Sequence, residues 1–215
     1  MNKLNKILLI ILFFNSCVND RNTEVQLEKT LVNSNENCVY SANLKATDVI
    51  WSGFKTTDKI KVTGKFNKIS SNKIQNKNEF SNLSELIEDL DFSIDLSSSS
   101  SGDEIRDLNL KNYFFNLLAS NFVLNGKFEN IEDDSVYVVL DFFGKQKKVK
   151  LGYAYKNKMI QIKGSIDLVE SLGAIKAFES ISNKCYDLHK GPDGVSKTWK
   201  EVDVLIKAPI IKSCN

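Results

Sequence analysis

Residues 122–168 read FVLNGKFENIEDDSVYVVLDFFGKQKKVKLGYAYKNKMIQIKGSIDL, and this stretch decides the fold. It contains four segments in which apolar and polar side chains alternate, separated by turn-forming residues at 133–134, 144–145 and 156–157. A period of two places one set of side chains on each face of a sheet. The alternation therefore predicts an antiparallel meander of strands with one apolar and one charged face.

The apolar face of this meander is large and unbroken. An open apolar face and free strand edges are both unfavourable in water, so the sheet must pack on another element or close on itself. The side chains predicted to share this face are Phe122, Leu124, Gly126, Phe128, Val136, Val138, Leu140, Phe142, Val149, Leu151, Tyr153, Tyr155, Ile160, Ile162, Gly164, Ile166 and Leu168.

Similar patterns on either side of the meander predict the remaining elements of an all-β domain over residues 38–215. Further strands are expected at 39–44, 49–55, 60–69, 91–96 and 199–207, and the last of them should close the sheet. Helical spacing appears at 81–89, 103–120 and 169–181. Loops are expected at 67–78, in the flexible serine run 97–102, and at 183–197. There is no internal repeat and no candidate second domain.

The first 37 residues are predicted to be a signal peptide followed by a tether. Lys3 and Lys6 precede an apolar run at 7–14, which is shorter than the roughly 20 residues needed to span a bilayer. Residues 1–16 therefore read as a signal peptide. The run ends at Ser16–Cys17, which resembles the lipobox of bacterial lipoproteins, although an ordinary signal peptide with an incidental cysteine is the alternative. A lipidated Cys17 and a polar tether (17–37) would hold the domain on a membrane of the bacterial cell envelope, facing the periplasm or the cell surface.

Charge argues against one class of partner. Removing residues 1–16 takes away two lysines, which leaves 29 − 2 = 27 basic against 27 acidic side chains. Nucleic-acid-binding domains usually carry a strong basic excess, so we expect no nucleic-acid partner. The oligomeric state is left open, and it includes a possible homodimer.

Three cysteines remain if Cys17 carries lipid. Export permits disulfides, and an odd number leaves one thiol free. The first and last strands of a closed antiparallel barrel are neighbours that run in opposite directions, so Cys38 and Cys214 would lie side by side. We therefore favour a Cys38–Cys214 disulfide with a buried, free Cys185. Pairing of Cys185 with Cys214 is the alternative.

Several segments together resemble the YceI-like family of exported proteins over about residues 38–208. The segments are WSGFK at 51–55, VTGKF at 62–66, FSID at 92–95, and RDLNLK at 106–111 followed by the aromatic group at 113–115. The resemblance implies a lipocalin-like antiparallel β-barrel with one or two short helical excursions and a long apolar cavity. It also implies a polyisoprenoid or quinone-like lipid as ligand, with no catalytic residues and no cofactor. The lipoprotein leader and the loop after Cys185 depart from the simplest form of the family.

Our candidate cavity-lining residues combine these faces with the preceding strands. They are Phe54, Val62, Phe66, Phe92, Ile94, Phe114, Phe122, Leu124, Phe128, Val138, Leu140, Phe142, Tyr153, Ile162, Ile166 and Val204. The alternative is that these side chains fill the interior themselves, as in small barrels, which would make the protein a structural or interaction module.

The loop from Cys185 to Asp193 suggests a third, less favoured reading. His189 is the only histidine, and with Cys185 and Asp187 it could be imagined as a metal site or a nucleophile. A metal site needs three or four converging ligands and a cysteine nucleophile needs an orienting third group. We therefore expect no metal and no catalytic residue here. Arg106 is a hypothetical contact for a polar headgroup at the cavity mouth.

Overall fold

The computed structural model describes residues 37–142 and 144–214. The predicted signal peptide, Cys17 and nearly all of the tether lie outside these residues. The strands are β1 (Cys38–Ala42), β2 (Asp48–Lys55), β3 (Ile60–Phe66), β4 (Ile69–Ser70), β5 (Asp91–Asp95), β6 (Ser99–Ser100), β7 (Val123–Ile131), β8 (Ser135–Phe142), β9 (Lys145–Lys156), β10 (Met159–Asp167) and β11 (Glu201–Cys214). The α-helices are α1 (Asn72–Asn76), α2 (Leu83–Ile87), α3 (Glu104–Tyr113) and α4 (Ile175–Lys184).

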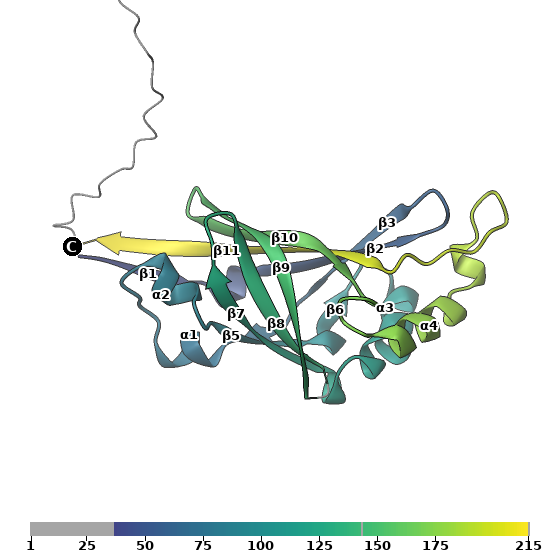
Figure 1. The fold of residues 1–215 in the computed structure, drawn as a ribbon, viewed down its shortest axis with the longest axis horizontal. Helices are drawn as coiled ribbons and strands as arrows, with labels where there is room; N and C mark the ends of the chain where they lie inside the picture. The colour runs from purple at the N-terminus through teal and green to yellow at the C-terminus, as the bar shows by residue number, and fades with distance from the viewer. Residues whose placement is uncertain (1–36, 143, 215) are drawn as a thin grey trace, which may run out of the picture. The chain divides into compact units, whose positions relative to one another are not determined.

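The strands form one antiparallel sheet in the order β4-β5-β7-β8-β9-β10-β11-β2-β3-β6, with β1 paired to β11. Figure 1 shows this sheet curling around an interior, with the meander β7 to β10 as its central wall. The predicted meander is confirmed, since β7–β8, β8–β9 and β9–β10 are all antiparallel neighbours. The last strand closes the sheet as expected, because β11 pairs with both β10 and β2.

The predicted apolar face of the meander points inward. Val136, Leu151 and Ile162 are among its most buried side chains. At Gly126 the ring of Phe92 on β5 lies so close that a β-carbon would come within 2.4 Å of its Cζ. The absence of a side chain there lets β5 and β7 approach each other.

Phe122 does not belong to this face, which corrects the prediction. Asn121 and Phe122 have φ of +54° and +60° in a 3₁₀ turn, Ser120–Phe122, so the chain reverses before β7 begins. The Phe122 ring instead lies beneath Lys111, whose Nζ is 5.6 Å from the ring centroid.

The serine run at 97–102 is ordered, which corrects its prediction as a flexible loop. Ser99 and Ser100 form β6 and pair with Phe66 and Lys65 of β3. A few residues earlier, Ile94 and Ser93 of β5 pair with Ile69 and Ser70 of β4. Since β4 follows β3 after two residues, the chain from β3 to β4 runs beside the chain from β5 to β6. This pairing connects the two ends of the strand order and closes the barrel.

The strand ends are joined by the predicted disulfide. Cys38 and Cys214 are register partners in the β1–β11 pair, and their Sγ atoms are bonded at 2.13 Å. The favoured pairing is therefore confirmed, and Cys185 is a free, buried thiol as predicted. The final strand runs seven residues further than the sequence pattern predicted, because residues 208–214 pair with β10 and β1.

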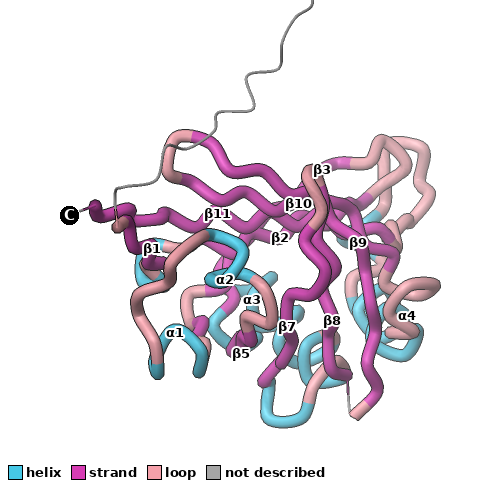
Figure 2. Tube along the Cα trace, turned by 60° about the vertical axis from the view of Figure 1, so that its left-hand side comes forward, coloured by secondary structure: helices cyan, strands magenta, loops and turns pink. Residues whose placement is uncertain are grey.

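The helices lie outside the sheet at its two ends. Figures 1 and 2 show α1 and α2 near β1, and Figure 1 shows α3 and α4 packed together at the opposite end. Residues 67–78 hold β4 and α1 and are not simply a loop, since Ser71 caps α1 and Asp91 accepts hydrogen bonds from its first backbone amides. The N-cap of α2 is Asn82, whose side-chain oxygen accepts a hydrogen bond from the backbone N–H of Glu85. None of the described helices is long and apolar enough to cross a membrane.

Candidate functional site: the barrel cavity

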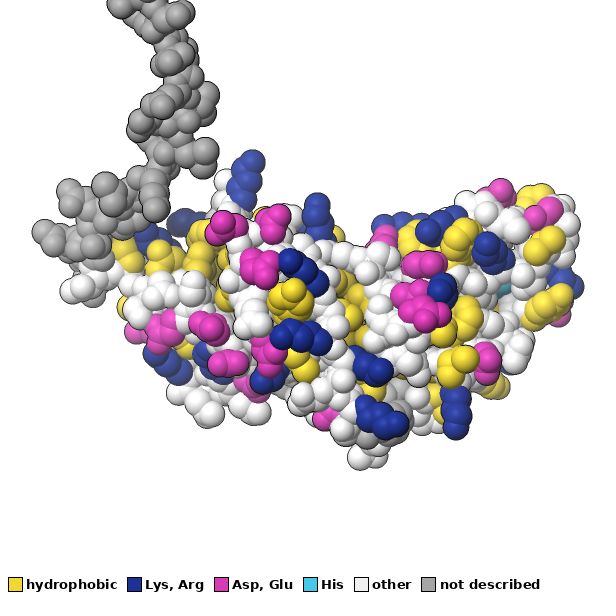
Figure 3. Space-filling model, in the orientation of Figure 1, with side chains coloured by type: hydrophobic (Ala, Val, Ile, Leu, Met, Phe, Trp, Pro, Cys, Tyr) yellow, Lys and Arg dark blue, Asp and Glu magenta, His cyan; other side chains and the backbone are white. Residues whose placement is uncertain are grey.

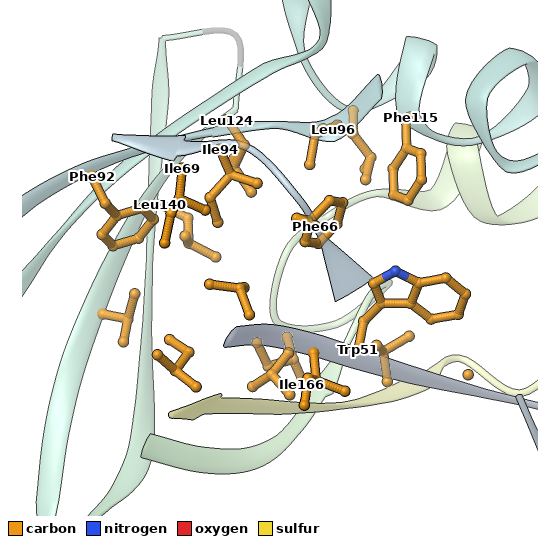
Figure 4. Close-up of a pocket in the computed structure, with 18 of the residues that line it drawn as sticks. Trp51, Phe66, Ile69, Phe92, Ile94, Leu96, Phe115, Leu124, Leu140 and Ile166 are labelled. Atoms are coloured by element: carbon orange, nitrogen blue, oxygen red, sulfur yellow. The ribbon is translucent and has the colours of Figure 1, made fainter. Parts of the chain in front are cut away.

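The interior of the barrel contains a cavity of about 550 Å³. Its walls come from almost every strand and from α3, α4 and the segment 185–199, and they are overwhelmingly apolar. Figure 4 shows side chains from opposite walls pointing toward a common space, with Trp51 and Ile166 facing Ile94 and Leu96. The side chains that the β-strand alternation points inward therefore surround an open volume and do not fill it.

Fourteen of the sixteen candidate residues line this cavity. They are Phe54, Val62, Phe66, Phe92, Ile94, Phe114, Leu124, Phe128, Val138, Leu140, Phe142, Ile162, Ile166 and Val204. Phe122 does not, because it precedes β7 in the turn described above. Tyr153 does not either, since it packs half-buried against the edge of the core, where burial raises the pKa of its hydroxyl. Contact of the fourteen with a ligand stays a prediction.

Aromatic rings stiffen both ends of the cavity. Phe66 contacts Phe115 edge-to-face with ring centroids 5.6 Å apart, and Phe92 lies 5.2 Å from Phe128. The indole of Trp51 lies against Gly64, where a β-carbon would be 2.3 Å from Cζ2, and its Nε1 donates to Ser99 Oγ at 3.0 Å. This close approach at Gly64 fixes Trp51 as part of the wall.

Part of the lining lies outside the candidate set. Trp51 shares the inward face of β2 with Val49 and Gly53, so the period of two could have assigned it. Phe178 and Ile181 line the cavity from α4, and their spacing of three is a helical signal. No local pattern marks Ile105 and Leu188 as lining residues, since both are also exposed to solvent.

One end of the cavity is shaped by the turn between β2 and β3 and the loop that follows α4. The backbone N–H of Thr56 donates to Lys197 O at 2.8 Å, and Trp199 Nε1 donates to Thr56 O at 2.8 Å. Thr57 Oγ1 donates to Asp193 Oδ2 at 2.7 Å. Thr56 is itself β-branched with φ of +61°, a costly conformation for such a residue. These contacts hold the loop against the turn and fix the rim of the cavity.

Three of the polar side chains in the lining lie at this same end of the cavity. Lys55, Cys185 and His189 all line the cavity. Within the described residues, no carboxylate lies within ion-pair distance of Lys55. His189 Nδ1 lies 2.7 Å from Thr198 Oγ1, and burial together with the Lys55 charge holds the pKa of His189 below its usual value. A half-buried positive charge thus stands beside a neutral imidazole at the end of an apolar cavity.

Arg106, the predicted headgroup contact, does line the cavity. Its guanidinium is already engaged, with NH2 3.1 Å from Asp103 Oδ2 and NH1 3.2 Å from Ser101 Oγ. Asp107 accepts hydrogen bonds from the backbone and hydroxyl of Ser101. The Arg106–Asp107 pair therefore orders the start of α3, and the ionic contact with Asp103 leaves Arg106 less available to a ligand than Lys55.

The geometry does not support a nucleophile or metal site in the 185–193 loop. Burial raises the pKa of the Cys185 thiol, whereas a nucleophilic cysteine needs a lowered one. Asp187 points outward to Lys190, and Asp193 is engaged by Thr57. No group of three or more metal-ligating side chains converges anywhere in the part of the chain that the structure describes.

We predict that His189 titrates below pH 6.5, the usual value for an exposed histidine. Because it is the only histidine, its ring signals in an NMR titration are unambiguous. Replacing Lys55 by methionine should raise the pKa toward 6.5, since it removes a repelling charge. The unfolded chain takes up the proton more readily than the folded chain, so stability should fall as pH drops below 6.5. A pKa at or above 6.5 in the parent protein would contradict this environment.

Comparison with known proteins places the fold. No family model and no curated protein sequence matches the chain. A polyisoprenoid binding domain from Saccharophagus degradans, implicated in plant cell wall breakdown, matches with a TM-score of 0.52 and 15% identity over 80% of this chain and 97% of that chain. BcnA from Burkholderia cenocepacia matches with a TM-score of 0.45 and 13% identity, over 79% of this chain and 99% of that chain. The YCEI protein of Campylobacter jejuni matches with a TM-score of 0.40 and 15% identity, over 72% and 85%.

The first of these similarities covers nearly the whole described barrel, including the strands that surround the cavity. At 15% identity it shows a common fold and says nothing by itself of a common ligand. The fold expected from the residues at 51–66 and 92–115 is the fold observed. The chain is thus a lipocalin-like antiparallel β-barrel with the fold of the polyisoprenoid binding domain, and this is the fold that the resemblance to the YceI-like family predicted.

Proposed function

We propose that this protein is an exported bacterial lipoprotein that binds a long apolar lipid of isoprenoid type in its barrel cavity, without transforming it. The observation that carries the proposal is the apolar cavity of about 550 Å³, which lies within the usual range for small-molecule sites. Water is a poor occupant, because a volume equal to about 18 water molecules would meet few polar partners on these walls.

The ligand class follows from the chemistry of the walls. Each buried methylene group contributes about 0.8 kcal/mol, so an apolar chain gains affinity along its whole length without any specific polar contact. The fold neighbour from Saccharophagus degradans is described as a polyisoprenoid binding domain, which supports the isoprenoid class. Lys55 and His189 offer a positive charge and a ring nitrogen to a polar headgroup at one end of the chain.

The proposed localisation in the cell rests on different evidence. The apolar run at 7–14 and Cys17 favour export and lipidation, and the Cys38–Cys214 disulfide suits an oxidising compartment. A membrane-anchored binding protein would meet an isoprenoid lipid where such lipids reside. A structural module with a filled interior, the alternative considered above, is disfavoured by the open volume inside the barrel.

Native mass spectrometry of the protein purified from its bacterial membranes tests the proposal. We expect a discrete excess mass that is lost on organic extraction and yields isoprenoid fragments. Intact mass of the same sample would report the acyl groups on Cys17. A clean apo mass together with an extract free of isoprenoids would overturn the proposed ligand, and an unmodified Cys17 would overturn the anchor.

A further inference from the structure

Exposed hydrophobic side chains gather at one end of the barrel. Only three of the large hydrophobic residues exposed in the described chain, Val123, Tyr155 and Ile211, lie elsewhere. The others come from the β2–β3 turn, α3 and the 3₁₀ turn after it, α4, and the 186–195 loop, and they are Ile60, Ile105, Leu108, Tyr113, Leu117, Ile175, Tyr186, Leu188 and Val195. Figure 3 shows hydrophobic side chains clustered over this end of the molecule, where Figure 1 places α3, α4 and the loop.

This exposed surface is continuous with the cavity. Ile105 on α3 and Leu188 on the 3₁₀ turn Asp187–His189 are both lining residues, yet they are 71% and 60% exposed. No other exposed large hydrophobic of the described residues lines the cavity. These two side chains therefore mark a mouth, through which an apolar chain could leave the cavity while staying in contact with hydrocarbon.

Helix α3 carries an outward apolar stripe that the fold leaves uncovered. Leu110 and Phe114 line the cavity and are partly or fully buried, whereas Ile105, at the edge of the cavity, and Leu108, one turn further along, are exposed to solvent. A surface helix of a soluble protein normally keeps polar residues on its outer face. We name the exposed residues around the mouth the mouth patch, and they are Ile105, Leu108, Tyr186, Leu188 and Val195.

Lysines surround the mouth patch in excess over carboxylates. Lys59 and Lys197 hold their Nζ atoms 4.5 Å and 3.8 Å from the centroid of the Trp199 ring, and Lys184 lies 5.0 Å from that of Tyr113. Among the described residues, the lysines here without an ion-pair partner are Lys55, Lys59, Lys61, Lys111, Lys176, Lys184 and Lys197. The carboxylates of the same segments that form no ion pair are Asp58, Glu104, Asp107, Glu179 and Asp193, which is fewer than the lysines.

We propose that the mouth patch docks on the surface of a lipid bilayer that contains anionic headgroups. The aliphatic side chains would enter the interface between headgroups and acyl chains, and the surrounding lysines would contact the phosphates. The aromatic rings of Tyr186 and Trp199 suit the same boundary, where one side is apolar and the other wet. The proposal rests on the proposed function, since it gives the lipid a path from the bilayer into the cavity without crossing water.

Site-specific fluorescence on the full chain tests which end of the barrel meets the bilayer. An environment-sensitive dye is attached to the new cysteine of Leu108→Cys or, as a control, of Ile211→Cys. The parent chain, treated with the same dye, reports any labelling of the buried thiol of Cys185. Leu108 and Ile211 are 58% and 53% exposed, and neither lines the cavity. With vesicles of phosphatidylglycerol and phosphatidylcholine, the Leu108 dye should become brighter, shift to the blue and be quenched by lipid-borne quenchers. The fluorescence of the Ile211 dye should not change, even where acyl groups on Cys17 anchor the N-terminus in the vesicle.

A charge substitution provides the second measurement. In a full chain that also carries Cys17→Ser and so has no acyl anchor, Leu108→Asp should lower partition of the protein into these vesicles about tenfold, because an exposed leucine loses its burial in the interface. Ile211→Asp should leave partition unchanged. Equal responses at positions 108 and 211 would overturn the proposal. So would a Leu108 signal that grows with protein concentration in the absence of vesicles, because that would assign the patch to a second copy of the chain.

Vesicle composition and ligand content separate the remaining possibilities. Equal partition into pure phosphatidylcholine vesicles would overturn the role given to the lysines. Native mass spectrometry of the Leu108→Asp protein distinguishes the two proposals, because this side chain lies outside the cavity and its loss should leave bound lipid in place. Bound lipid without dye insertion would overturn docking alone, and dye insertion without bound lipid would overturn the proposed function alone.

Discussion

Replacing Gly53 by phenylalanine is expected to abolish lipid binding while leaving the barrel folded. Gly53 lies on the inward face of β2, opposite Val62 of β3, and lines the cavity. A β-carbon built on it meets no atom of the described residues within 4 Å, so the new ring enters open volume. A ring that displaces about four methylene groups of the ligand removes roughly 3 kcal/mol, or more than a hundredfold in affinity.

Stability should not suffer from this substitution. Gly53 needs no left-handed backbone conformation, and glycine within a strand is less favourable than a residue with a side chain. The melting temperature should therefore stay the same or rise. Lys61→Phe is the matched control, because Lys61 on neighbouring β3 is exposed and does not line the cavity, so the same ring there should leave binding intact. Retention of lipid by Gly53→Phe at parental affinity would show that the ligand lies outside this cavity.

Removing the Cys38–Cys214 disulfide is expected to destabilise the domain strongly. The bond closes a loop with a sequence separation of 176 residues. In the chain-entropy model such a loop is worth about 5 kcal/mol, and native disulfides are generally worth about 2–5 kcal/mol. Either value is a large part of the free energy of unfolding of a typical domain, which is roughly 5–15 kcal/mol.

The effect should begin at β1. This strand pairs in the sheet with β11, and its further backbone contact is the bridge between Tyr40 and Phe80. Without the disulfide, hydrogen exchange should accelerate first in residues 38–42. The measurement is urea unfolding of the parent and of the C38A/C214A double variant, each with and without reductant.

Cys185→Ala supplies the control for the disulfide experiment, because it removes the free thiol and leaves the bond in place. Reductant should lower the unfolding midpoint of the parent and of Cys185→Ala by the same amount, and it should not affect the double variant. A parent protein whose midpoint is insensitive to reductant would show that the disulfide contributes little.

The loop after α4 acquires a new role from the tertiary structure. From sequence, Cys185 and His189 suggested a metal or nucleophilic site, because both residue types are chemically versatile. Burial of Cys185 and the bond of His189 to Thr198 make them parts of the cavity wall. The same loop carries Tyr186, Leu188 and Val195, which we assign to membrane docking. The position of this loop at the mouth of the cavity therefore indicates its role better than its residue types do.

Alternation along single strands was enough to predict the apolar face of the meander and part of the cavity lining. That signal is local, because the pleat alone sends Val138 and Leu140 to one side and Val139 to the other. The Cys38–Cys214 pairing was likewise predictable, since it needs only the knowledge that first and last strands are neighbours. Phe122 was misplaced because two residues in the left-handed conformation reverse the chain before β7. The alternation of apolar and polar side chains gives no sign of such a reversal.

Three features were decided only by contacts between distant segments. The sheet closes through pairing of Phe66 with Ser99, and serine is a weak strand former, so its strand depends on its partner. Whether the inward side chains fill the barrel or leave a cavity depends on the radius of the closed sheet, which no single strand encodes. The mouth exists because α3 and the 186–195 loop meet at one end and leave Ile105 and Leu188 between cavity and solvent. Alternation in the sequence indicated which side chains of a regular strand face inward, because that is a property of each strand. The tertiary structure decided what they enclose and where the cavity opens, because those are properties of the closed sheet.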